Sequence, residues 1–180
     1  AAWAGELGVC RFLWEHGAAA TIRTKNSYGR TPMFAACWSG HLGVAKWLFE
    51  VGAAEDIRTK DNGGRTPMWA ACQEGHLDVI KWLFEVGAAE DIRTETDTGF
   101  PPTEIACIAC KFNVTTWLIL QGAANNAEGH ADPAILQRDV YAHRRLIALL
   151  QLLVDENSAF TSLVLTAVRF TAERQEGFPP

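Results

Sequence analysis

Few side chains in this sequence combine the types and spacing that chemistry requires. The nearest approach is Cys107-x-x-Cys110, a spacing that suits a redox dithiol or half of a zinc site. No second close cysteine pair completes four zinc ligands, so we favour the alternative, in which Cys107 is a small residue of the core. The sequence shows no phosphate-cradling glycine loop, no Ser/His/Asp ordering and no paired-carboxylate motif. We therefore predict no catalytic residues, no cofactor and no bound metal.

The remaining histidines and acids also have structural interpretations. His41 and His76 each follow a glycine, and we expect their imidazoles to join turn and helix by hydrogen bonds, whereas His16 is expected to be solvated surface. Glu55-Asp56 and Glu90-Asp91 lack the alternating acids of a calcium loop. We expect these two acidic pairs to form a solvated edge.

The composition excludes several classes of protein. The 180 residues are 48% hydrophobic and 21% charged, with a net charge of −5, which disfavours a dedicated nucleic-acid or anionic-membrane binder. No apolar run approaches the ~20 residues of a membrane span, and no signal peptide is visible. Five cysteines without a disulfide pattern favour a reducing, intracellular and cytoplasmic setting. The chain begins at Ala1, so we expect it to be a fragment of a longer protein.

The elements that position these residues recur every 35 residues. The run from Gly29 to Met33 returns from Gly64 to Met68, and the run from Trp47 to Ala54 returns almost unchanged from Trp82 to Ala89. Three registers keep the same step: Gly17, Gly52, Gly87 and Gly122; Leu13, Leu48, Leu83 and Leu118; Val9, Val44, Val79 and Val114. The sequence is therefore a series of similar structural units.

Each unit is predicted to contain two short helices and a hairpin. Thr31 can cap the first helix, Pro32 suits its first position, and Gly40 ends it. A second helix begins near Leu42 and ends at Gly52, with apolar residues on more than one face. Such a helix must be covered by neighbours on both sides, which the stacking of units provides.

The motif of one unit resembles the ankyrin repeat. Its pattern G-x-T-P-L-H-x-A-A-x-x-G-H appears here as the run from Gly29 to His41 and recurs from Gly64 onward. The resemblance implies an all-α ankyrin-repeat solenoid, that is, stacked helix-turn-helix units with β-hairpin loops. We place repeats in residues 1–124, as a partial first unit 1–25 and units of about 26–60, 61–95 and 96–124. Residues 125–180 are expected to form a diverged terminal repeat and a C-terminal helical cap, with 133–154 as one helix or two.

The chain departs from the family pattern in several places. Its unit has 35 residues instead of ~33, and the extra pair is expected just after the second helix, at Ala54-Glu55. Phe34 and Trp69 replace the family histidine and are predicted to be core. Cys110 stands where the turn glycine stood, and the left-handed region costs a non-glycine residue about 1–2 kcal/mol. We therefore expect that turn to have a different shape.

The tryptophans fall into two groups. Trp47, Trp82 and Trp117 share one register with Phe12, and we expect an aromatic ladder inside the stack. Trp3 and Trp38 occupy a variable position before the turn glycine, where either partner contact or half-buried packing explains them.

The resemblance implies that partners bind on the concave side, which carries the hairpin tips and first helices. The predicted function is a protein–protein interaction module, an intracellular scaffold for a protein or peptide. The alternative is a regulatory or targeting segment of a larger enzyme whose catalytic domain lies outside this chain. An enzyme using the cysteine pair, or nucleic-acid binding through basic hairpins, is less favoured. The residues expected to contact a partner are Tyr28, Arg30, Trp38, Asn62, Arg65, Gln73, Glu74, Asp97, Phe100 and Ile108.

Overall fold

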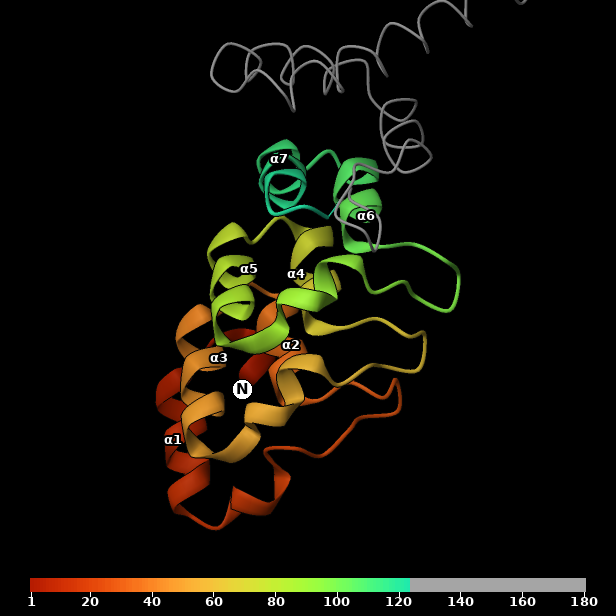
Figure 1. Cartoon of the computed structure of the whole chain (residues 1–180). Coiled ribbons are helices and arrows are strands. Elements are labelled where there is room, and N and C mark those ends of the chain that lie inside the picture. The colour runs from red at the N-terminus through yellow and green to blue at the C-terminus, as the bar shows by residue number, and fades with distance from the viewer. Residues whose placement is uncertain (124–180) are drawn as a thin grey trace, which may run out of the picture.

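Helices follow one another in antiparallel pairs along the chain (Figure 1). The computed structural model describes residues 1–123, so the expected terminal repeat and helical cap of 125–180, including 133–154, lie outside the described residues. The first pair combines a 3-10 turn, Ala2–Ala4, with α1, Leu7–Glu15. The later pairs are α2, Pro32–Trp38, with α3, Leu42–Leu48; α4, Pro67–Glu74, with α5, Leu77–Leu83; and α6, Pro102–Ile108, with α7, Phe112–Leu120.

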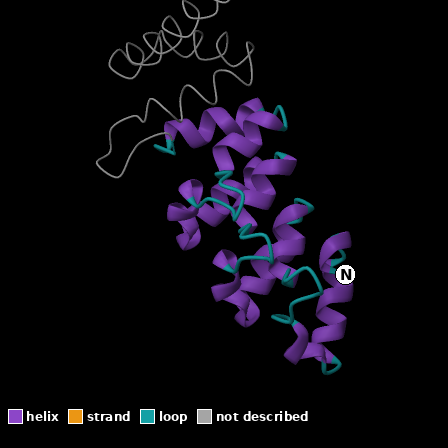
Figure 2. Ribbon diagram, turned by 90° about the vertical axis from the view of Figure 1, so that its right-hand side faces the viewer, coloured by secondary structure: helices purple, strands orange, loops and turns teal. Residues whose placement is uncertain are grey.

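The helices form two rows. Helices α2, α4 and α6 pack on one another in one row, and α1, α3, α5 and α7 lie beside them in the other, as Figures 1 and 2 show. The long loops extend from the side of the first row. Single backbone hydrogen bonds join successive loops, from Asn62 N to Tyr28 O (3.0 Å) and from Asp97 N to Gly63 O (3.2 Å). Within residues 1–123 these isolated bonds form no β-strand, so the expected hairpins are loops closed by turns.

The first helices begin as their sequence predicts. The Thr31 hydroxyl accepts a hydrogen bond from Phe34 N at 3.2 Å, and Thr66 does the same for Trp69 N at 3.2 Å. A proline follows each threonine at a position where its missing N–H leaves no unmade bond. Pro101 takes the place of the threonine before α6, which therefore has no side-chain cap.

One continuous core runs through the stack. Leu48, Leu83 and Leu118 belong to the same buried cluster, and Phe34 and Trp69 are buried as predicted. The 35-residue period therefore corresponds to real packing of equivalent side chains.

The aromatic ladder has a different composition from the one expected. Each ladder tryptophan packs edge-on against a ring that is 33 residues earlier, not against the previous tryptophan. The ring centroids are 6.2 Å apart for Trp14 and Trp47, 5.8 Å for Phe49 and Trp82, and 5.3 Å for Phe84 and Trp117. Phe12 is 57% exposed, so placing it inside the ladder was wrong. Among the described residues no helix covers that side of α1.

Histidine rings join successive units. The ring of His76 lies against Gly40 and occupies the space that a side chain there would need, and the φ of 75° at Gly40 is also unfavourable for other residues. Nε2 of His41 donates to the carbonyl oxygen of Trp3 at 3.1 Å. The predicted bridge therefore reaches the turn of the preceding unit.

The turn at Cys110 keeps the shape of the glycine turns. Cys110 has a φ of 57°, and Cys110 N donates to Cys107 O at 3.0 Å, as Gly40 N does to Cys37 O at 3.3 Å. The expectation of a differently shaped turn is wrong, because the packing of α6 and α7 holds this non-glycine residue in the left-handed region. The strain of about 1–2 kcal/mol remains in the fold.

A 3-10 turn follows both α3 and α5 and occupies the place expected for the extra residues. After α3 the chain passes Gly52, with a φ of 114°, and enters the 3-10 turn Ala54–Arg58; Ala89–Arg93 is its equivalent. Arginines of the preceding units reach these turns, with Arg58 Nε 3.1 Å from Asp91 Oδ1. Asp56 and Asp91 are buried, so the expected solvated edge holds only for the neighbouring glutamates.

Candidate partner-binding surface

Two arginines stack on one tryptophan at the side of the loops. The Cζ atom of Arg30 lies 4.5 Å from the ring centroid of Trp38, and that of Arg65 lies 5.9 Å from it. The Trp3 ring approaches the Trp38 ring with a centroid distance of 6.1 Å. These residues, with Asp61, are called the Arg–Trp cluster below. The contact combines cation–π attraction with an exposed aromatic surface.

Turns within the loops hold the two arginines in place. Asn26 Oδ1 accepts hydrogen bonds from Tyr28 N and Arg30 N, both at 3.0 Å. In the next loop Asp61 Oδ1 accepts from Gly63 N at 3.0 Å and from Arg65 N at 3.1 Å. A short polar side chain that bonds its own backbone in this way fixes the loop.

The second oxygen of Asp61 binds both guanidinium groups. Oδ2 lies 2.9 Å from Arg65 Nε, 2.7 Å from an Arg65 terminal nitrogen and 3.4 Å from Arg30 Nε. Burial by itself would raise the pKa of Asp61, but the hydrogen bonds from Arg65 and from the backbone of Gly63 and Arg65 outweigh it, so the pKa is below its ordinary value. The carboxylate is therefore ionised at neutral pH.

Both polar and apolar side chains lie at the other end of the side that carries the loops. Gln73 donates to Glu74 at 3.2 Å, and Trp69 Nε1 donates to the carbonyl oxygen of Phe100 at 3.0 Å. Asp97 is exposed in the third loop, and Ile108 is exposed at the end of α6.

The structure brings together only part of the predicted contact set. Arg30, Trp38 and Arg65 meet in the cluster, and Tyr28 joins them through its ring, 5.3 Å from Arg30 Cζ. Asn62 donates from its amide to Ser27 O at 3.1 Å and so links the loops. The others lie along the same row of helices and loops without ring or ion-pair contact to the cluster: Gln73, Glu74, Asp97, Phe100 and Ile108.

Two members of the cluster were absent from the predicted contact set. Trp3 shares the register of Trp38, and this shared register could have identified Trp3 from the sequence. Asp61 shares its register with Asn26 and Thr96, whose oxygen accepts from Phe100 N at 3.1 Å. Three residues that cap turns in one register identify the loop geometry but not the pairing of Asp61 with two arginines.

The described residues offer little for metal or thiol chemistry. Within residues 1–123 no three His, Cys, Asp or Glu side chains lie close enough to share a metal ion. Burial raises the pKa of Cys37 and of Cys72 well above that of an ordinary thiol, so both stay protonated at neutral pH. Cys107 is buried in α6 and Cys110 is exposed on its turn.

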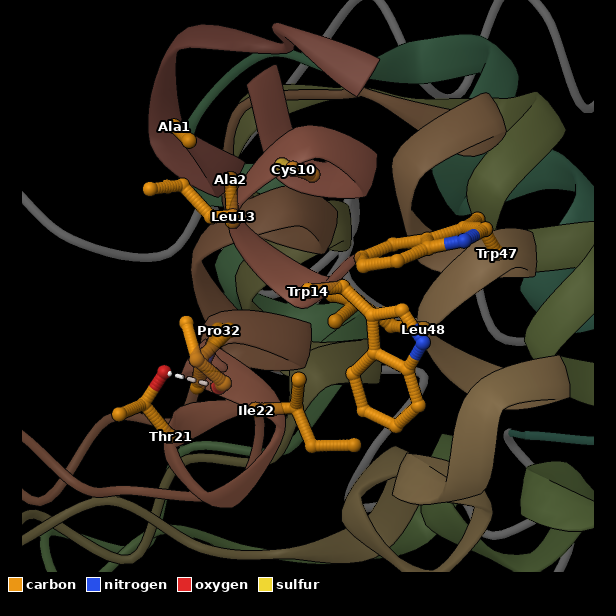
Figure 3. A pocket seen from close by; sticks show the side chains of 11 residues that line it. Ala1, Ala2, Cys10, Leu13, Trp14, Thr21, Ile22, Pro32, Trp47 and Leu48 are labelled. Carbon is orange, nitrogen blue, oxygen red and sulfur yellow. Dashed lines mark hydrogen bonds between the residues drawn. The ribbon is translucent and has the colours of Figure 1, made fainter. Parts of the chain in front are cut away.

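A cavity of about 190 Å³ lies between α1, the 3-10 turn Ala18–Thr21 and α3. Figure 3 shows the side chains of Leu13, Trp14, Ile22 and Leu48 around it. The hydroxyl of its one alcohol side chain, Thr21, donates to Ala18 O at 2.7 Å. With a mostly apolar lining and no charged side chain, this cavity offers less specificity than the Arg–Trp cluster.

A membrane-spanning helix is also absent from the described part of the chain.

A family model described as "Ankyrin repeats (3 copies)" matches residues 1–61 and 53–129. No curated protein matches the sequence.

Proposed function

Because the chain belongs to the ankyrin-repeat family, we propose that it holds a protein or peptide partner on one defined surface. Ankyrin repeats are generally protein–protein interaction modules and are typically not catalytic. The surface, called the loop face below, consists of loops 26–30, 61–65 and 96–100 with helices α2, α4 and α6.

The Arg–Trp cluster is the observation that supports this choice of face. Trp3 is 53% exposed and Tyr28 is 63% exposed, and both lie in ring contact with its members. Arginine and large aromatic side chains contribute most to binding at protein interfaces. The ion pairs with Asp61 and the loop turns hold the cluster before any partner arrives, which lowers the entropic cost of binding.

The opposite row of helices lacks such anchors on α3 and α5. These helices expose Gly43, Lys46, Asp78 and Lys81, which are small or charged. Lysine and aspartate are depleted at interfaces, so this surface is well suited to solvent.

Affinity capture with two matched double variants tests the proposal. Trp38→Ala/Arg65→Ala alters the loop face, and Lys46→Ala/Lys81→Ala alters the opposite face. We expect partners captured by the native chain and by the lysine variant to be lost with the first variant, after circular dichroism has shown that both are helical. Equal capture by all three proteins would contradict the assignment of the face.

A further inference from the structure

Arg30 has hydrogen-bond donors that the fold does not use. Only its Nε approaches Asp61 Oδ2, at 3.4 Å, whereas Arg65 places two nitrogens on the same oxygen at 2.9 and 2.7 Å. The terminal nitrogens of Arg30 donate to no other described residue. Because a guanidinium carries five N–H donors, the four on these nitrogens remain for a ligand.

The cluster also has an excess of positive charge. Two guanidinium groups share the single carboxylate of Asp61, whose side chain is 0% exposed, while the Arg30 side chain is 18% exposed. Trp38 covers one side of Arg30 at 4.5 Å and keeps water from it. An anion that reaches Arg30 is therefore attracted more strongly than it would be by a fully hydrated arginine.

Exposed aromatic rings adjoin the same guanidinium. The Tyr28 ring is 5.3 Å from Arg30 Cζ, and Trp3 extends the aromatic surface beyond Trp38. A ligand that fits both features carries an acidic group beside a large apolar group.

The charge of the rest of the face argues against a polyanion. Glu74 and Asp97 lie farther along the loop face, and the chain as a whole carries a net charge of −5. A row of phosphates along the face would meet these acids, whereas a single carboxylate would meet Arg30 alone. A peptide therefore fits better than a nucleic acid.

We propose that the Arg–Trp cluster recognises one acidic side chain of a partner peptide through the terminal nitrogens of Arg30, with a large apolar side chain within two residues of it packing on Trp38 and Trp3. This inference rests on the proposed function and names the chemistry of the partner. Carboxylate-to-arginine bonds with two parallel N–H donors are among the stronger and more directional contacts in proteins.

A displayed library of random 12-residue peptides provides the test, with the full 180-residue chain as bait. Three baits are compared: the native chain, Arg30→Gln, and Lys46→Gln, which makes the same change of charge on the opposite row. We expect the native and Lys46→Gln baits to select peptides rich in Asp or Glu near a large apolar residue. We expect the Arg30→Gln bait to lose the enrichment in acids.

One selected peptide is then measured by fluorescence anisotropy. Changing its acid to the amide should weaken binding to the native chain about tenfold, and should change binding to Arg30→Gln little. Arg30→Lys retains the charge without the paired donors and should also weaken the acidic peptide, which keeps the test decisive if Arg30→Gln does not fold.

Several results would overturn the inference. They are selection without acids, acid enrichment that survives Arg30→Gln, no selected peptide at all, and Arg30-dependent binding of a random 20-nucleotide RNA. Peptides without acids that are still lost on Trp38→Ala/Arg65→Ala would leave the proposed function standing while this inference fails. Peptides unaffected by that double variant would remove both.

Discussion

Substitution of Gly40 by alanine isolates the contact that joins one unit to the next. A Cβ atom on Gly40 would meet the imidazole of His76, with Cγ at 2.8 Å, and the φ of 75° is also unfavourable for alanine. Gly99 provides a matched control, because its φ of 80° is close to that of Gly40 and a methyl group added there would have no neighbouring atom within 4 Å. Both variants carry the backbone strain, and only Gly40→Ala carries the clash.

The expected magnitudes separate these two effects. Backbone strain costs about 1–2 kcal/mol in each variant. Crowding of a packed group adds about 1–3 kcal/mol for Gly40→Ala alone. For a protein of this size, each kcal/mol lowers the melting temperature by about 2–4 °C. Gly40→Ala should therefore melt several degrees below Gly99→Ala.

Urea unfolding followed by tryptophan fluorescence, together with calorimetry, measures the difference. His76→Ala in the Gly40→Ala background should recover part of the loss, because the ring that clashes is removed. Equal destabilisation by the two glycine variants, or no recovery in the double variant, would refute the reasoning that His76 packs on the turn of the preceding unit.

Three further changes test other parts of the structure. Cys110→Gly should raise the free energy of unfolding by about 0.5–1 kcal/mol, since the left-handed strain exceeds the added entropy of glycine in the unfolded chain; a loss of stability would contradict this. Asp61→Asn should cost about 1–2 kcal/mol at neutral pH. The folded-state pKa of Asp61 is below its ordinary value of 3.8. The difference in stability between Asp61→Asn and the native chain should therefore shrink as the pH falls below 3.8 through that lowered pKa. A constant difference in acid denaturation curves would exclude the assigned ion pair. Arg58→Ala should cost about 1–3 kcal/mol by leaving the buried carboxylate of Asp91 without its cation, whereas Glu90→Ala, at an exposed carboxylate, should cost at most about 1 kcal/mol; similar losses in urea unfolding would count against the difference in burial.

The helices and the core could be predicted from the sequence because their signals are local and repeated. Thr31, Pro32 and Gly40 mark where a helix begins and ends without reference to any other part of the chain. The burial of Phe34 and Trp69 followed from a register that is aromatic in two successive units. Local capping and repeated apolar positions therefore account for most of the fold.

Contacts between units were harder to predict, because they depend on which side chains meet across a stack. Asp56 looked solvated beside Glu55, yet an arginine 33 residues earlier pairs with it and permits its burial. Phe12 occupies a core register but lies on a side of α1 that no described helix covers. The backbone at Cys110 follows the turn set by neighbouring helices against its own local preference.

The candidate site, like the fold, could be predicted from the sequence only in part. The register of Trp38 and the charge of Arg30 identified the loop face, since exposed aromatic and arginine side chains are typical of interfaces. The role of Asp61 emerged only from the structure, because one carboxylate oxygen holds arginines from two different loops.

Hydrogen exchange of the full chain with and without a captured partner tests the central claim most directly. We predict slower exchange in loops 26–30 and 61–65 and in helices α2 and α4 when the partner is bound, with α3 and α5 unchanged. Protection confined to α3 and α5 would contradict this claim and would place the partner on the opposite row of helices.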